Sequence, residues 1–268
     1  MIVCKSASEL ARMRAVNLLV AEVLSELAGI VAPGVTTGQL DATAEERVGR
    51  AGATPAFKGY RGYPATVCIS VNEEVVHGIP STRALTEGDI VSLDMGAVMG
   101  GFYGDAALTV PVGRIAERPS ELLRVTEDAL YYGIAQVRIG GRVSDIGHAV
   151  QAHVEAHGFS VVREFVGHGI GASLHEEPQV PNYGQPGRGP RLTDGMVLAI
   201  EPMVTLGRPA VKVLADRWTA VTRDGSLSAH FEHTVAVTKA GPLILTAIDQ
   251  AAALRRVEQM TEQRAGAR

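Results

Sequence analysis

The sequence predicts an α/β (α+β) fold made of two related halves, each with two helices followed by a strand-rich segment. Three observations predict it: amphipathic helical patterns occur in two pairs, strand-like runs follow each pair, and the second half repeats the spacing of the first. The chain has 268 residues, 46% of them hydrophobic, and can bury a sizeable core. We expect a single domain over residues 1–268, with approximate halves at 6–115 and 116–246. The tail at 247–268 shows no apolar stripe beyond its start, which predicts a short helix or a frayed end.

The composition excludes several classes of protein. A net charge of −4 at pH 7 gives no broad attraction to nucleic acid or to an anionic membrane, so we expect neither partner. Residues 1–14 lack the apolar core of a signal peptide, and no later run reaches the roughly 18 apolar residues of a membrane helix. The two cysteines, Cys4 and Cys68, are too few for a disulfide framework and suit a reducing compartment. We expect a cytoplasmic protein, with a monomer as the default state.

Two helices open the first half. Ser6 with Glu9 forms a capping-box pattern at the start of the first helix. Thr36 with Gln39 repeats this pattern, and Gly52 closes the second helix. The apolar residues at helical spacing are Leu10, Met13, Val16, Val20, Val23 and Leu27, then Leu40, Ala44 and Val48.

A strand-like run at residues 65–71 and a glycine-rich hairpin at residues 88–110 complete the first half. If the hairpin closes symmetrically next to Met99, Asp94 and Asp105 lie directly opposite each other, with Cβ atoms roughly 5 Å apart. Two ionised carboxylates at that distance repel each other. The pair therefore needs either a shared proton or a cation.

The second half repeats this plan, with one helix expected at about residues 120–137 and another ending at Gly158. At one constant offset, Leu40, Ala44, Val48 and Gly52 superpose on Ile146, Val150, Val154 and Gly158. Asp94 falls on Glu201 at an offset one residue larger, and Asp105 finds its counterpart in Glu232 across a connection 20 residues longer. We therefore expect four acids to meet where the two halves join.

His168 adds a nitrogen donor to these acids. It follows a strand-like run and lies between two glycines, which allow a close approach of backbone or substrate. Four carboxylates and one imidazole suit Mn(II), Fe(II), Co(II) or Zn(II) and are enough for a pair of ions. The alternative is that each acid caps a turn or pairs with a surface lysine. For the whole set this alternative is unattractive, because apolar neighbours surround the acids and buried unpaired charge is costly.

Several other patterns have ordinary structural explanations. The stretch GHGIGA nearly matches a dinucleotide-binding fingerprint, but Pro178 and Pro181 deny it the helix that must follow. His77 and His175 stand beside turn residues, where an exposed histidine without a role is the default interpretation. Cys68 alternates with apolar residues, which favours a small buried side chain over a thiol nucleophile.

Five motifs in order resemble those of type I methionine aminopeptidase, a group of the M24 metallopeptidases. They are VCISVNEEVVHGIP, SLDMGAVMGGFYGDAALTV, GHGIGASLHEEPQVPNYG, DGMVLAIEPM and SLSAHFEHTVAVT. The resemblance runs from about Ser6 to Thr246 and implies the pita-bread fold, in which a pseudo-two-fold domain has a central antiparallel sheet backed by helices. It also implies the metal ligands. Asp94 and Asp105 resemble ligands, with Asp105 shared by both ions; His168 and Glu201 resemble ligands of one ion; Glu232 resembles a bridge.

The resemblance further implies removal of the initiator methionine from nascent chains when the second residue is small. A hydroxide between two divalent ions would attack the methionyl carbonyl, and Glu201 would carry the proton to the leaving amine. His77 and His175 would hydrogen-bond the substrate amide and the developing oxyanion. The methionine pocket would be lined by Tyr60, Tyr63, Cys68 and Trp218. Nascent polypeptide N-termini are the implied partners, together with a transient association with the ribosome.

Two alternative functions stay open at this point. A proline-specific dipeptidase or an aminopeptidase P would share the metal ligands, but these enzymes usually carry a large N-terminal domain. A catalytically inactive binding module on the same fold would tend to lose ligands, whereas all five are present here. Val76, Ala172 and Leu174 depart from residues that are common in the family and bear on the shape of the pocket. The resemblance begins so close to Met1 that we expect no ribosome-docking or zinc-finger extension.

Overall fold

Residues 1–266 are described by a computed structural model of the chain. Its main sheet runs in the order β1-β4-β5-β14-β9-β7-β8, with β2 on β4 and β15 on β14. The strands of this sheet are β1 (Thr54–Pro55), β2 (Val67–Val71), β4 (Ile90–Met99), β5 (Phe102–Pro111), β7 (Gly167–Gly169), β8 (Glu176–Val180), β9 (Val197–Ile200), β14 (Glu232–Thr238) and β15 (Gly241–Ile244). Two small sheets accompany it. They consist of β13 (Ser228–His230), β10 (Met203–Thr205) and β6 (Ser160–Val161), and of β11 (Val211–Val213), β12 (Ala220–Thr222) and β3 (Glu74–Val76).

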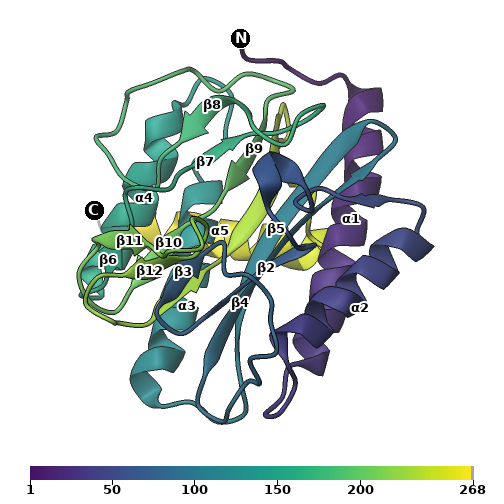
Figure 1. The fold of residues 1–268 in the computed structure, drawn as a ribbon. Coiled ribbons are helices and arrows are strands. Elements are labelled where there is room, and N and C mark those ends of the chain that lie inside the picture. The colour runs from purple at the N-terminus through teal and green to yellow at the C-terminus, as the bar shows by residue number, and fades with distance from the viewer. Residues whose placement is uncertain (267–268) are drawn as a thin grey trace.

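Two pairs of helices accompany the two halves of the sheet (Figure 1). They are α1 (Ala7–Ile30) with α2 (Thr37–Arg50), and α3 (Glu117–Ile134) with α4 (Val143–Ala156). The predicted capping boxes are confirmed: Ser6 and Thr36 each accept from the third backbone amide of their helix, and the Glu9 and Gln39 side chains accept from the cap amides. These contacts satisfy amide donors that the first turn leaves free. Within residues 1–266, no helix combines the length and apolar character needed to cross a membrane.

The internal repeat predicted from the sequence corresponds to equivalent elements. Helices α2 and α4 each have 14 residues, and the apolar residues that superpose in sequence are fully buried in both. Gly52 and Gly158 follow these helices with φ angles of 69° and 73°, and Gly88 and Gly195 precede β4 and β9 with φ angles of 96° and 85°. Such angles are in the left-handed region that glycine tolerates best. At the junction of the halves β5 pairs antiparallel with β14, Ala107 opposite Glu232.

The register of the β4–β5 hairpin differs from the prediction. Met99 pairs with Phe102, so the turn consists of Gly100 and Gly101, whose φ angles are 58° and 81°. Two consecutive positive φ angles suit a two-residue hairpin turn, and they move the centre of the hairpin by one residue from the expected position. Asp94 is therefore opposite Ala107, not opposite Asp105. The two acids are diagonal neighbours, and the period of two keeps them on one face of the sheet.

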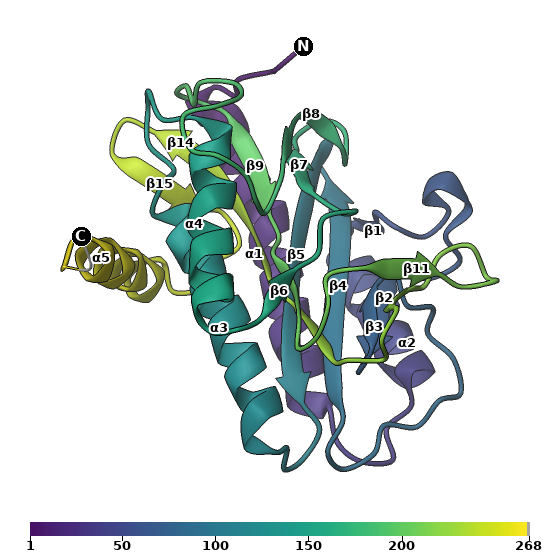
Figure 2. The same ribbon diagram turned by 90° about the vertical axis from the view of Figure 1, so that its left-hand side faces the viewer.

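The prediction that the tail lacks an apolar stripe is wrong. Helix α5 (Gln250–Gly266) buries Ala253, Val257 and Met260, which are spaced at i, i+4 and i+7 and join the hydrophobic cluster of α3. Figure 2 shows α5 to the left of α3, viewed nearly along its axis. The stripe is hard to recognise in the sequence because its first member is an alanine and charged residues separate the three positions. Arg256 fastens the helix through ion pairs to Glu127 and Asp128 on α3.

Candidate metal centre

A cavity of about 200 Å³ opens among strands from both halves of the chain. Every site residue predicted from the sequence lines it: Tyr60, Tyr63, Cys68, His77, Asp94, Asp105, His168, His175, Glu201, Trp218 and Glu232. His77 is half-buried and His175 is exposed, and both side chains line this cavity. The segment after Gly169 leads into the strand β8 and not into a helix. The GHGIGA stretch therefore lacks the helix that a dinucleotide-binding motif requires.

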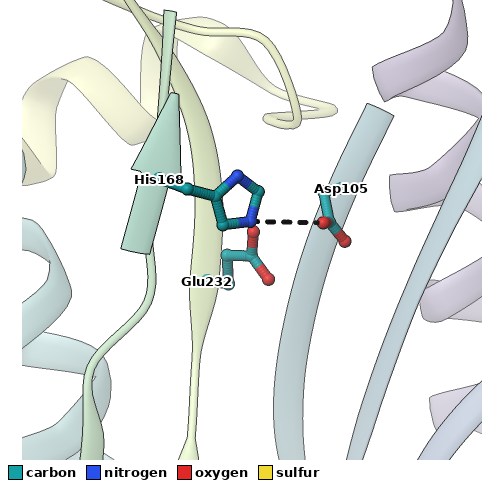
Figure 3. A group of neighbouring side chains, drawn as sticks. All are labelled: Asp105, His168 and Glu232. Atoms are coloured by element: carbon teal, nitrogen blue, oxygen red, sulfur yellow. Dashed lines mark ion pairs between the residues drawn. The ribbon is translucent and has the colours of Figure 1, made fainter. Parts of the chain in front are cut away.

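Asp105, His168 and Glu232 converge on one point from three different strands (Figure 3). One ligand atom from each lies within 4.8 Å of the other two. The His168 Nε2 atom is 3.9 Å from Asp105 Oδ2 and 3.5 Å from Glu201 Oε1. Strand pairing explains the convergence, because β14 lies between β5 and β9, and β9 pairs with β7. Asp94 reaches the same cavity from β4.

The chemistry of these acids fits a divalent cation. Asp105 Oδ1 and Glu232 Oε1 are buried without a hydrogen-bond partner, and no ion pair among the described residues joins the four acids to a lysine or an arginine. Burial raises the pKa of Asp94 to about 7 and raises the pKa values of Asp105, Glu201 and Glu232 well above their usual range; for these three the neighbouring acids add to the effect. A cation among them would remove this penalty on the charged forms.

His168 is prepared to act as a ligand. Its Nδ1 atom lies 2.9 Å from the carbonyl oxygen of Gly169 and donates to it, which leaves the lone pair of Nε2 directed at the acids. Burial, with a smaller contribution from the nearby His175, lowers the pKa of His168 to about 4. The imidazole is therefore neutral near pH 7, as metal coordination requires.

Aromatic side chains form the apolar wall of the cavity. The rings of Tyr63 and Trp218 meet edge-on with centroids 5.2 Å apart, and His77 packs edge-on against Trp218 and Phe165. Tyr63 donates its hydroxyl to backbone carbonyls, so its ring has a fixed position. Burial and the nearby Asp94 raise the pKa of the Cys68 thiol, which keeps it neutral and agrees with a packing role.

Two further histidines line the cavity, and burial is the main cause of the lowered pKa of each. Burial lowers the pKa of His77 to about 4, and His175 contributes to the shift. Burial also lowers the pKa of His175, with a contribution from Arg61. The hydroxyl of Tyr60 lies 2.9 Å from His175 Nδ1, and the two rings stack. Both imidazoles can thus present an N–H donor to the cavity at neutral pH.

Sequence reasoning missed several supporting residues. His230 is 1% exposed, and its Nε2 atom lies 3.9 Å from Glu201 Oε2 without a hydrogen-bond partner. Asn182 donates to the backbone carbonyl of Glu201, and Thr234 donates to that of Asp105. The position of His230 two residues before Glu232 was a usable signal, because this spacing places both residues on one face of an extended segment.

Comparisons with known proteins identify the family of the chain. The model of Metallopeptidase family M24 matches residues 11–239. Methionine aminopeptidase 1 of Bacillus subtilis is 53% identical over 248 residues, which cover 92% of this chain and 100% of the relative. Methionine aminopeptidase 1 of Mycobacterium tuberculosis is 48% identical, over 90% of this chain and 94% of the relative.

Solved structures give the same result. Methionine aminopeptidase from Thermotoga maritima matches with a TM-score of 0.90 and 49% identity, over 92% of this chain and 99% of that chain. Prolidase from Pyrococcus furiosus shares the fold alone, with a TM-score of 0.74 and 20% identity, and the match covers 66% of its chain. The proline-specific alternative is therefore not favoured. The chain has the predicted pita-bread fold and belongs to metallopeptidase family M24, among the methionine aminopeptidases.

Proposed function

We propose that the cavity is the active site at which this aminopeptidase hydrolyses the bond between an N-terminal methionine and a small second residue. Relatives about half identical over nearly the whole chain support the removal of N-terminal methionine. The observation that carries the assignment to this cavity is the convergence of Asp105, His168 and Glu232 within 4.8 Å, with one buried oxygen each of Asp105 and Glu232 lacking a hydrogen-bond partner. These ligand atoms come from both halves of the chain.

Five residues would hold two divalent ions: Asp94, Asp105, His168, Glu201 and Glu232. Co, Mn, Fe and Zn all suit this oxygen-rich set with one imidazole. When bound, such ions supply a water molecule of lowered pKa and a Lewis acid for the carbonyl of the substrate. Such cations would offset the cost of holding four carboxylates together in one cavity.

Glu201 would move the proton. It lies between two imidazoles, with Oε1 near His168 and Oε2 near His230. Burial raises its pKa, and the charge of Asp94 raises it further, so its carboxyl can retain a proton taken from the attacking water. The proton would then pass to the leaving amine, as general acid–base catalysis requires.

His77 and His175 would orient the substrate and stabilise the charge on the oxygen. If Tyr60 donates to His175 Nδ1, the N–H of His175 is on Nε2 and can donate to the oxyanion. The methionine side chain would occupy the wall formed by Tyr63, Cys68 and Trp218, because a flexible thioether packs well against aromatic edges. A nascent chain would enter by its N-terminus. We further propose a cytoplasmic monomer that associates transiently with the ribosome, as the resemblance implies.

A tripeptide assay tests the function. With Co(II) or Mn(II), we expect release of methionine from Met-Ala-Ser but not from Met-Lys-Ser, and no release after chelation. Activity restricted to proline-containing dipeptides would contradict the assignment and favour the prolidase-like alternative. Glu201→Ala should lose activity with an unchanged circular dichroism spectrum, and retained turnover would overturn the assigned role of Glu201.

A further inference from the structure

Lys5 is a buried cation at the beginning of the chain. It lies one residue before the cap of α1, yet it contacts the second half of the molecule. Its amide donates to the carbonyl of Gly195 at 2.6 Å, and its Nζ atom donates to Glu176 Oε2 at 2.5 Å and to the carbonyl of Val3 at 3.0 Å. The side chain of Lys5 is 3% exposed and that of Glu176 is 14% exposed. Such burial of an ammonium group is sustainable only because the group is paired.

Two glycines make room for this segment. A Cβ atom on Gly171 would overlap Cε and Nζ of Lys5, and one on Gly195 would overlap the backbone of Lys5. Gly195 also has a φ angle of 85°, which other residues rarely adopt. The space is therefore shaped for the Lys5 side chain by two turns of the second half.

The ion pair is connected directly to a residue of the cavity. Glu176 accepts from the Ser173 amide through its other oxygen at 3.2 Å, which closes the loop 173–176. His175 lies in this loop, with its ring centroid 4.2 Å from that of His168 and its Nδ1 atom against the Tyr60 hydroxyl. The carboxylate of Glu176 thus links Lys5 to the peptide segment that carries His175.

We propose that Lys5 is a positioning residue for the hydrolysis. Through Glu176 it holds the loop 173–176 so that the His175 imidazole faces the reacting carbonyl of the substrate. This inference rests on the proposed function, from which it takes the role of His175. A merely structural pair between the halves would affect stability and leave turnover unchanged.

Lys5→Met tests this role, with methionine release from Met-Ala-Ser measured first for the wild type. We expect kcat to fall about 10- to 100-fold, because small displacements of a catalytic group have effects of this size. KM and the dissociation constant of Mn(II) by calorimetry should change less than about twofold. In a His175→Ala background the same substitution should lower kcat less than about twofold further, because the effects of coupled residues are not additive.

A second measurement does not depend on activity. Hydrogen exchange in the metal-free protein should be faster for the peptide that contains residues 171–176 in Lys5→Met, since the loop has lost its anchor. Arg47→Met is the matched control: it breaks the Arg47–Glu26 ion pair of 2.6 Å between α2 and α1, and should change neither kcat nor this exchange. If Lys5→Met does not fold, Lys5→Met/Glu176→Gln removes both charges and should show the same loss of kcat.

Several results would overturn the inference. A folded Lys5 variant with wild-type kcat would do so while leaving the proposed function intact. An equal additional loss in the His175→Ala background would show that Lys5 acts elsewhere. A wild-type protein that releases no methionine would contradict the proposed function itself and the role of Lys5 with it.

Discussion

The first half joins its two acidic strands by a two-residue turn, whereas the second half joins the equivalent strands through β10 to β13. Asp94 and Asp105 thus stand on one tight hairpin, and Glu201 and Glu232 stand at the two ends of a long excursion. The excursion has no counterpart in the first half. It carries Trp218 into the cavity and places His230 beside Glu201.

The repeated and the non-repeated parts of the molecule contribute different residues to the site. The frame common to both halves places Asp94 and Glu201 at equivalent positions, because β4 and β9 begin after the equivalent glycines Gly88 and Gly195. The excursion, which is not repeated, adds the indole of Trp218 and the imidazole of His230. An approximately symmetric scaffold therefore carries an asymmetric site, in which only the second half supplies an imidazole to the predicted ligands.

The largest expected effect separates the two acids at equivalent positions. Glu201→Gln should lower kcat about 10²- to 10⁴-fold, because it removes a general acid–base group. Asp94→Asn should act mainly through the metal, with Mn(II) affinity reduced about 10- to 100-fold by calorimetry and activity partly recovered at high Mn(II). Equal losses of activity in the two variants, with no recovery at high Mn(II), would contradict the different roles of Glu201 and Asp94.

Metal removal should weaken the junction of the two halves. At a free Mn(II) concentration 100 times its dissociation constant, the free energy of unfolding should exceed that of the metal-free protein by about 2.7 kcal/mol. Urea unfolding with and without a chelator measures this difference. Identical midpoints would contradict a metal site formed by strands of both halves.

The metal-free protein should also lose stability as the pH rises. Burial raises the pKa of Asp94 to about 7, above the roughly 3.9 of an unfolded aspartate. Between these values the folded state retains a proton that the unfolded state has released, so stability falls from about pH 4 to pH 7. Asp94→Asn should flatten the slope in this range, and an unchanged slope would count against the pKa shift of this residue.

The long excursion between Glu201 and Glu232 should affect KM more than kcat. Trp218→Ala should raise KM for Met-Ala-Ser about 30-fold, as expected when a half-buried aromatic anchor worth about 2 kcal/mol is removed. Trp218→Phe is the matched control and should stay within a few-fold of the wild type. A fall in kcat at unchanged KM would place Trp218 in the reaction instead of the pocket.

The smallest expected effect concerns the ends of α2 and α4, which are equivalent in the two halves. Gly52→Ala and Gly158→Ala place a side chain at φ angles of 69° and 73°, where a Cβ atom meets no close neighbour. Each should cost about 1 kcal/mol of unfolding free energy, because both suffer the same backbone strain. Costs that differ by more than about 1 kcal/mol in urea unfolding would break the equivalence of the two helix ends.

Local signals explain why much of this molecule is predictable. The Ser6 and Thr36 caps, the helical periods and the closing glycines depend on contacts between neighbours in the chain, so their residues identify them directly. The grouping of all predicted site residues in one cavity followed from family motifs together with the internal repeat. The stripe of α5 was missed because its burial depends on the surface of α3, which no pattern within the tail reveals.

By itself, the sequence determined the helices, the repeat and the chemical types gathered at the site, since these follow from side-chain period and identity. Only the tertiary structure decided the diagonal placement of Asp94 and Asp105, the approach of His230 to Glu201 and the pairing of Lys5 with Glu176. The physical reason is that register and long-range packing depend on turn geometry and on surfaces distant in the chain. A shift of one residue in a hairpin alters every pair without altering a single local preference.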